Sequence, residues 1–283
     1  MSRKSSINTI RSGTGSGGVQ SDGARQLTER YNRDACAYRD LWAPVLRIAG
    51  RRLLSEFRAS AVQRVIDVGA GVGALAEDIR AAFPGAFVAG IDRSAGMLRL
   101  APDWMPRVAA DALQLPVASG TVDLVLLLFV LFHLEPPLAA LQEARRVLRR
   151  RGKVGTLTWS GEFESRASRI WTECLDEFGA APVEMPVQTC HSAVDTPEKI
   201  ENLLRDAGFS DIHAWRGEIE RLITAEHLLS LRTRLGSCRP RFDSLDVVAQ
   251  QACIADARRR MQALSPADFV AKGSVVYAVA GQI

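Results

Sequence analysis

The stretch from Val65 to Gly73, V-I-D-V-G-A-G-V-G, constrains the fold of this chain more than any other. A short apolar run enters a turn with glycines at alternate positions (Gly69, Gly71 and Gly73, with Ala70 between the first two), and a segment of helical apolar spacing follows. This pattern predicts a strand, a tight turn and a helix N-terminus. Glycine tolerates positive φ and has no Cβ, so such a turn can approach a small molecule closely. NAD- and nucleotide-binding domains share this feature, so it does not identify the ligand by itself.

Two acidic residues narrow the class of ligand. Asp67 stands just before Gly69, where a carboxylate would repel a pyrophosphate and attract a cation. Asp92 closes the next apolar run, Phe87 to Ile91, where an α/β fold places a carboxylate on a ribose diol. A ligand with an adenosine ribose, a positive group and no phosphate fits both acids.

Apolar strands alternate with amphipathic helices from Arg64 onward, which predicts an α/β fold with a doubly wound parallel sheet covered on both faces. The alternation lapses after Trp159 and resumes at Thr196. The expected strands are 64–68, 86–91, 107–110, 122–128, 154–159, 212–222 and 274–280. The expected helices are 74–83, 94–100, one from Pro137 to Gly152, 168–178, one from Pro197 to Gly208, and two near 225–235 and 245–263.

The N-terminal part divides into two segments. Residues 1–24 are rich in Ser, Gly, Arg and Thr and have few apolar residues, which predicts a disordered tail, with a transit peptide as the alternative. In residues 25–60 the apolar side chains have helical spacing, which predicts an N-terminal helical cap.

Composition limits the class of protein. With 47% hydrophobic residues in 283, the chain can bury a full core, and its apolar runs are shorter than a membrane span requires. The net charge of +4 says little about partners. The five arginines between Arg145 and Arg151 are expected at the solvated end of a helix that closes at Gly152, and a nucleic-acid patch is the alternative.

Cysteine and histidine usage points to an intracellular protein without a metal site. The 5 cysteines include no closely spaced pair, so we expect reduced thiols in a cytoplasmic protein. Cys174 shares helical spacing with apolar neighbours and is expected to pack in the core. The 4 histidines lack the short spacing typical of metal ligands.

Several motifs occur together in the order of one family. They are the D-x-G-x-G-x-G segment at 67–73, Asp92, the Asp111-Ala112 pair, the run 121–134 and the segment 143–155. On these residues the chain resembles the class I S-adenosylmethionine-dependent methyltransferases, in their ubiquinone/menaquinone-biosynthesis-like small-molecule branch. The resemblance covers roughly residues 60 to 160 and continues weakly to the C-terminus.

The resemblance implies a mostly parallel, seven-stranded, Rossmann-like sheet in a domain spanning 61–283. Helical insertions at about 161–193 and 224–273 would form a lid over the substrate. The N-terminal helical cap, with Tyr31, Tyr38 and Trp42, would close over the cofactor and the substrate. The alternative is that these three side chains only pack the cap against the sheet.

The cofactor implied is S-adenosyl-L-methionine. Asp67 would hold its ammonium, and the backbone of the turn from Gly69 through Ala70 and Gly71 to Gly73 would line its carboxylate and ribose. Asp92 would accept both ribose hydroxyls. The remaining implied contacts are Arg93, Met97, Asp111 and Ala112 to the adenine and Leu128 to the methionine portion.

His133 is the candidate catalytic residue. It lies where the family's loop faces the cofactor's methyl group, and an imidazole can take up a proton near neutral pH. Many relatives have paired histidines here, whereas this chain has Phe132 in the first position. A structural loop histidine is the alternative, and His191 is a weaker candidate.

The leading hypothesis is transfer of a methyl group to an O, N or C atom of a small, hydrophobic metabolite by in-line displacement, without nucleic acid as partner and without a metal. A non-catalytic cofactor-binding protein and a macromolecule methyltransferase are alternatives. The latter is disfavoured because Glu135-Pro136-Pro137 falls too late for the N-P-P-aromatic motif. A dehydrogenase is disfavoured by Asp67 and by the glycine spacing. The oligomeric state and the acceptor are not determined by the sequence.

Overall fold

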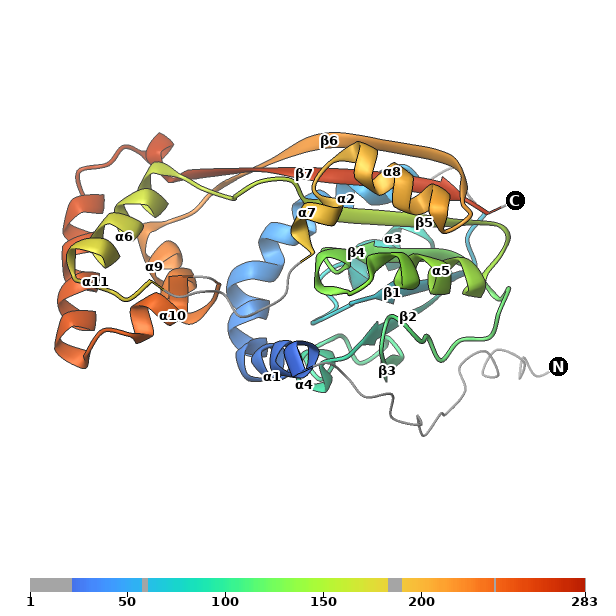
Figure 1. Ribbon diagram of the computed structural model, residues 1–283, viewed down its shortest axis with the longest axis horizontal. Helices are drawn as coiled ribbons and strands as arrows, with labels where there is room; N and C mark the ends of the chain where they lie inside the picture. Colours follow the sequence, from blue (N-terminus) through green and yellow to red (C-terminus); the bar gives the residue numbers. More distant parts are fainter. Residues whose placement is uncertain (1–21, 58–60, 183–189, 237, 283) are drawn as a thin grey trace.

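A seven-stranded sheet forms the centre of the computed structural model, which describes residues 22–57, 61–182, 190–236 and 238–282 (Figure 1). The strand order is β3-β2-β1-β4-β5-β7-β6, and β7 runs antiparallel to both of its neighbours. The predicted α/β fold with a mostly parallel sheet is confirmed. The strands are β1 (Arg64–Val68), β2 (Phe87–Asp92), β3 (Arg107–Ala109), β4 (Val122–Leu128), β5 (Leu148–Trp159), β6 (Ser210–Leu222) and β7 (Val270–Gly281).

The β4 strand lies in the middle of the sheet because its sequence is apolar on both faces. Every residue from Val122 to Leu127 is buried, as a parallel strand covered by helices on both sides requires. β4 pairs in parallel with β1 and β5, and β1 pairs in parallel with β2. The carboxyl ends of β1, β2 and β4 therefore meet at one edge of the sheet.

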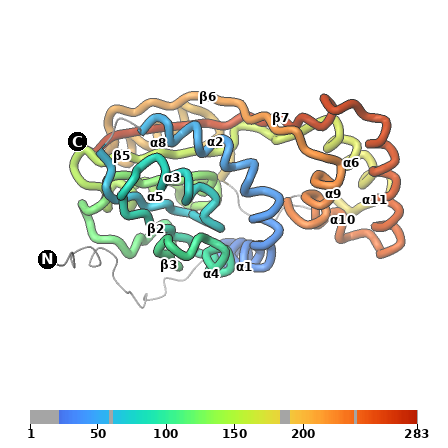
Figure 2. The backbone as a smooth tube through the Cα atoms, turned by 180° about the vertical axis from the view of Figure 1, so that it is seen from behind, coloured from blue at the N-terminus to red at the C-terminus, as the bar shows by residue number. Residues whose placement is uncertain are grey.

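Helices cover both faces of the sheet, with α5, α7 and α8 on one face and α2 and α3 on the other (Figures 1 and 2). The α8 helix begins as predicted, because the Thr196 side chain accepts from the Lys199 N–H and Pro197 occupies the first turn. The bounds of the covering helices are α2 (Ala43–Ser55), α3 (Ala76–Ala82), α5 (Pro137–Val147), α7 (His191–Val194) and α8 (Pro197–Asp206). Two shorter elements lie in the same part of the chain, α4 (Ala95–Leu98) and the 3-10 turn η2 (Leu131–His133).

The N-terminal elements form one continuous helical arm. It consists of α1 (Asp22–Ala37), the π-helical turn η1 (Tyr38–Trp42) and α2 (Ala43–Ser55). The α2 helix packs on the sheet, whereas α1 crosses beside α4 at the edge where the strands end (Figure 2). Most of the predicted tail, residues 1–21, lies outside the described residues.

Four helices form a separate unit, the helical lobe, at the far ends of the long strands β6 and β7 (Figure 1). They are α6 (Arg166–Glu177), α9 (Ala225–Arg234), α10 (Cys238–Asp243) and α11 (Val247–Met261), with the 3-10 turn η3 (Pro266–Phe269) beside them. Their core includes fully buried Trp171, Cys174 and Cys253, so Cys174 packs as predicted. No described helix has both the length and the apolar composition of a membrane span.

Two predictions about elements are wrong. The α5 helix ends at Val147, and Arg149, Arg150 and Arg151 lie on β5 instead of at a helix end. Leu148, which continues the helical apolar spacing, is buried as the strand residue that pairs with Val122. The α10 helix, which is too short to show a hydrophobic period, was not predicted.

Candidate active site

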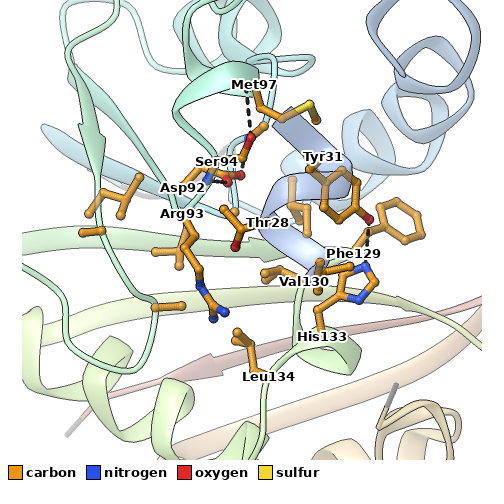
Figure 3. A pocket seen from close by; sticks show the side chains of 18 of the residues that line it. Thr28, Tyr31, Asp92, Arg93, Ser94, Met97, Phe129, Val130, His133 and Leu134 are labelled. Atoms are coloured by element: carbon orange, nitrogen blue, oxygen red, sulfur yellow. Dashed lines mark hydrogen bonds between the residues drawn. The ribbon is translucent and has the colours of Figure 1, made fainter. Parts of the chain in front are cut away.

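A pocket opens at the carboxyl ends of β1, β2 and β4, under α1 (Figure 3). The space within it, including the open solvent at its mouth, is about 720 Å³. A smaller pocket adjoins it and shares Gly69, Gly71 and Leu128 with it. Of the predicted site residues, the larger pocket is lined by Gly69, Gly71, Asp92, Arg93, Met97, Ala112, Leu128 and His133, and the smaller pocket adds Asp67 and Ala70.

The glycine turn has the backbone that only glycine adopts without strain. Gly69, Gly71 and Gly73 have φ of 74°, 56° and 67°. A Cβ on Gly69 would lie 2.7 Å from the Val130 side chain. Gly73 lines neither pocket, because its open side faces Pro102, whose Cδ would be 2.8 Å from an added Cβ. Gly73 thus serves close packing, and the first two glycines border the pocket.

Asp92 closes β2 and holds the turn in place. Its Oδ2 accepts from the Gly71 N–H at 2.8 Å and its Oδ1 accepts from the Ser94 N–H at 2.7 Å. Burial raises the pKa of this carboxyl, although the two backbone donors act in the opposite direction. Each oxygen keeps a second lone pair that can accept from a ligand hydroxyl.

Asp67 is a buried carboxyl without a partner. Its relative exposure is 4%, and in the described part of the chain its side chain has no hydrogen bond or ion pair. Burial, and then the nearby Asp92 carboxylate, raise the pKa of Asp67 to about 7. A cationic group in the smaller pocket would relieve both effects, since an opposite charge favours the ionised form.

The α1 helix forms the roof of the larger pocket through Leu27, Thr28 and Tyr31. The Tyr31 hydroxyl and His133 Nε2 are joined by a 2.9 Å hydrogen bond, visible in Figure 3. Tyr38, on η1, lines both pockets, and its ring packs edge-on against Tyr31 at 5.8 Å. The structure therefore places the two predicted tyrosines at the pocket.

His133 lies on η2 and is half-buried. Burial, followed by the charges of Arg30, His191 and Arg93, lowers the pKa of His133 to about 3. The low-dielectric surroundings and the neighbouring cations disfavour its charged form, and its role as a general base stays a prediction. His133 Nδ1 is buried and finds no hydrogen-bond partner in the described structure.

The remaining predicted residues lie around the β2 and β3 ends. Met97 is buried beside Gly71, and Arg93 lines the pocket. Asp111 lines neither pocket, and its Oδ1 accepts from the Leu113 N–H at 2.9 Å and from Arg93 Nη2 at 3.5 Å. Its neighbour Ala112 does line the pocket. His191 stacks on Phe132 at 4.2 Å and does not border the pocket.

Aromatic side chains extend from the pocket toward the helical lobe. Phe129, which follows β4 and has a φ of 55°, lines both pockets, and its ring centre lies 4.9 Å from that of Trp159. Trp159 in turn contacts Trp42 at 5.8 Å and Phe163 at 6.0 Å. We call these four residues the aromatic wall. Trp42 thus packs in this wall and does not line either pocket.

The role of the helical insertions as a lid over the substrate stays a prediction. No described residue of α6, α9, α10 or α11 lines either pocket. The lobe instead touches α1 and η1, which lie between it and the pocket. Residues 183–189, which belong to the predicted insertion, lie outside the described residues.

Comparisons with known proteins agree with this architecture. A family model described as a methyltransferase domain matches residues 66–155. The chain is 35% identical over 134 residues to the malonyl-[acyl-carrier protein] O-methyltransferase of Hahella chejuensis, an alignment that covers 46% of this chain and 48% of that protein. It is 29% identical over 183 residues to the demethylmenaquinone methyltransferase of Streptomyces avermitilis, covering 60% and 78% of the two chains. The chain spans about half the length of the first of these relatives.

Solved structures share the fold. A structure of an S-adenosylmethionine-dependent methyltransferase from Thermotoga maritima superimposes with a TM-score of 0.52 at 16% identity. The match covers 90% of this chain and 99% of that chain. The likeness in fold therefore extends well beyond the segment that the family model matches.

Proposed function

The domain that this chain contains belongs to the class I S-adenosylmethionine-dependent methyltransferases, and we propose that the chain methylates an O, N or C atom of a small, hydrophobic acceptor. When bound, the sulfonium cofactor supplies an electrophilic methyl group and leaves as a neutral thioether. The protein's part in such a displacement is to align the reactants and exclude water, which can lower the barrier by about 7–11 kcal/mol.

Asp67 provides the observation that supports this proposal most strongly. An unpartnered carboxyl whose pKa is raised to about 7 by burial and by Asp92 destabilises the protein unless a cation binds there. We assign Asp67 to the cofactor's ammonium. A pyrophosphate beside the same turn would meet two carboxyls, so a dinucleotide does not fit this site.

The other cofactor contacts follow from the lining of the pockets. The backbone from Gly69 through Ala70 to Gly71 would border the cofactor's amino-acid portion, and Leu128 would pack beside it. Asp92 would accept from the ribose hydroxyls through its free lone pairs. Arg93, Met97, Asp111 and Ala112 would surround the adenine, with Asp111 oriented by Arg93 and Leu113.

The acceptor would lie between His133 and the aromatic wall. Phe129 gives that side of the pocket an apolar surface and is backed by Trp159, which suits a hydrophobic acceptor. His133 would stay uncharged, so it can accept a proton or a hydrogen bond from the acceptor. With its low pKa it is a weak base and would mainly orient the nucleophile.

The same property of His133 favours a second candidate, a cofactor-binding protein without turnover, because a weak base gives little help to an acceptor that must lose a proton. The two candidates are separated by incubating the protein with methyl-labelled cofactor and cell extract fractions, followed by mass spectrometry. A labelled product that disappears with Asp92→Ala would support the enzyme. Tight cofactor binding without any labelled product in repeated extracts would support the second candidate. The cytoplasmic location stays a prediction.

A further inference from the structure

The roof helix α1 is held on both sides of the face that covers the pocket. At about 3.6 residues per turn, Leu27, Thr28 and Tyr31 form one stripe, and this stripe lines the pocket. Asn32 and Asp34 lie on opposite sides of that stripe. Each of them makes a contact of a different kind, so the two edges of the roof are anchored to different parts of the molecule.

Asn32 joins one edge of α1 to the cofactor side of the sheet. Its Oδ1 accepts from Ser94 Oγ at 2.8 Å and from the Gly96 N–H at 2.7 Å. Gly96 permits this approach, because an added Cβ there would lie 2.7 Å from Asn32 Oδ1. With two hydrogen bonds and backbone packing, this edge is suited to act as the fixed side of the roof.

Asp34 joins the opposite edge to the helical lobe. Its side chain is only 10% exposed, and its Oδ1 accepts from Arg239 Nη1 of α10 at 2.7 Å. Arg239 is itself held by the lobe, since it donates to the Arg234 carbonyl at 3.1 Å and pairs with Asp243 at 3.3 Å. An arginine fixed in this way offers a rigid donor to α1.

Apolar and backbone contacts continue this junction along the arm. Ala37 and Leu41 pack against Leu231 and Leu235 of α9 in a small buried cluster. His227 Nε2 lies 3.1 Å from the Leu41 carbonyl oxygen in a hydrogen bond. The π-helical turn that follows α1 interrupts the regular helix between the roof and α2, and such turns occur often at functional sites.

We propose that Arg239 is a positioning residue that latches α1 over the bound cofactor through Asp34, so that the helical lobe sets how fast the cofactor leaves. This inference rests on the proposed function. Release from under Leu27, Thr28 and Tyr31 requires α1 to move, and breaking the Asp34–Arg239 ion pair loosens the lobe-side edge while the Asn32 contacts still hold the other edge. The lobe thus acts on the pocket through α1, although it contributes no lining residue.

The test compares Arg239→Ala with Arg241→Ala, a matched control on the same helix. Arg241 pairs with Asp176 inside the lobe and is not bonded to α1. Dissociation of tritiated S-adenosylhomocysteine into excess unlabelled ligand gives the rate. We expect Arg239→Ala to accelerate dissociation about threefold to tenfold, Arg239→Lys to restore part of the effect, and Arg241→Ala to leave the rate unchanged.

Two further measurements make the result decisive. Asp34→Ala also removes the bonds that Arg33 donates to this carboxylate within α1. Asp34→Ala combined with Arg239→Ala should therefore be no faster than Asp34→Ala alone, because Arg239 reaches α1 through Asp34. Hydrogen exchange of residues 22–37 in ligand-free protein should rise in Arg239→Ala and not in Arg241→Ala. Unchanged exchange and unchanged dissociation in Arg239→Ala would overturn the latch. Failure of every variant and of the wild type to bind the ligand would instead count against the proposed function.

Discussion

At the scale of single residues, Asp67 is the group whose protonation should be linked to cofactor binding. Its pKa of about 7 in the ligand-free protein means that a fraction of the molecules must lose this proton before an ammonium can pair with the carboxylate. Affinity for S-adenosylhomocysteine should therefore rise as the pH increases from 6 to 8 and then level off. In Asp67→Asn the affinity should be lower and independent of pH over this interval. Calorimetric titrations at several pH values measure both; the same pH slope in wild type and variant would contradict the assignment.

The low pKa of His133 gives a second prediction at this scale. The imidazole is uncharged from pH 5 upward. The single-turnover rate of the wild-type protein should therefore show no change near pH 6.5 that comes from titration of His133. His133→Ala should slow the methyl-transfer step by about 10²-fold, the scale for a misplaced reactant, because the residue orients the nucleophile. A loss below about threefold would remove His133 from catalysis and leave it as the partner of Tyr31.

Sequence patterns predicted the residues that belong to one short motif and missed those that act through tertiary contact. Asp67, the glycine turn and Asp92 lie within one strand–turn–helix–strand segment, and all are placed at the carboxyl ends of the adjacent strands β1 and β2. Their spacing in the sequence was therefore informative. Asn32 and Ser94 were missed because their 2.8 Å contact joins a helix and a turn that are distant in sequence. The pKa of His133 could not be read from sequence, since burial determines it.

At the scale of elements, the packing of α1 should be sensitive to a substitution at Gly96, which lies against Asn32 of this helix. Gly96→Ala would place a Cβ 2.8 Å from the Asn32 Cα, and overpacking of this kind costs about 1–3 kcal/mol. We expect weaker S-adenosylhomocysteine binding and a lower Tm. Gly161→Ala is the control, because its added Cβ would meet only the Ser274 Cβ at 3.9 Å. Equal effects of the two substitutions would show that α1 does not depend on this contact.

Elements with a clear local pattern, β1, β4 and the three longer helices of the lobe, were predicted closely, whereas the start of β5 and the short α10 were not. β1 and β4 are apolar on both faces and short, so their bounds follow from composition alone. β5 was predicted to begin later because Arg149 to Arg151 are polar, yet there the strand is exposed and tolerates charge. The lobe lies on β6 and β7, and no local pattern indicates that these strands extend beyond β5 to support it.

At the scale of the whole molecule, Asp67 and His133 should oppose each other in the pH dependence of stability. Asp67 is protonated up to about pH 7 when folded and up to about pH 4 when unfolded, so its contribution falls as the pH rises through that window. His133 is neutral above about pH 3 when folded, whereas the unfolded residue titrates near about 6.5, so its contribution rises between those values. The two slopes partly cancel in the wild type.

Replacing Asp67 or His133 singly should separate their two contributions to the pH dependence of stability. Asp67→Asn should gain stability between pH 4 and 6.5 and exceed the wild type at pH 8 by a few kcal/mol, on the order of the shift of about three pKa units. His133→Gln should lose stability over the same rise in pH. Urea unfolding of the ligand-free proteins at pH 4.5, 6 and 8 measures these differences. If the free energies of unfolding of the two variants change with pH in the same way, the pKa values of Asp67 and His133 are not shifted as strongly as their burial implies.

The central claim is that the acids beside the glycine turn select a phosphate-free adenosyl cation. Calorimetric titration of the wild-type protein with S-adenosylmethionine, S-adenosylhomocysteine, NAD and ATP tests it most directly. The account predicts saturable one-to-one binding of the first two ligands and no binding of NAD or ATP at the same concentrations. Binding of NAD or ATP with comparable affinity, or no binding of S-adenosylmethionine, would contradict it.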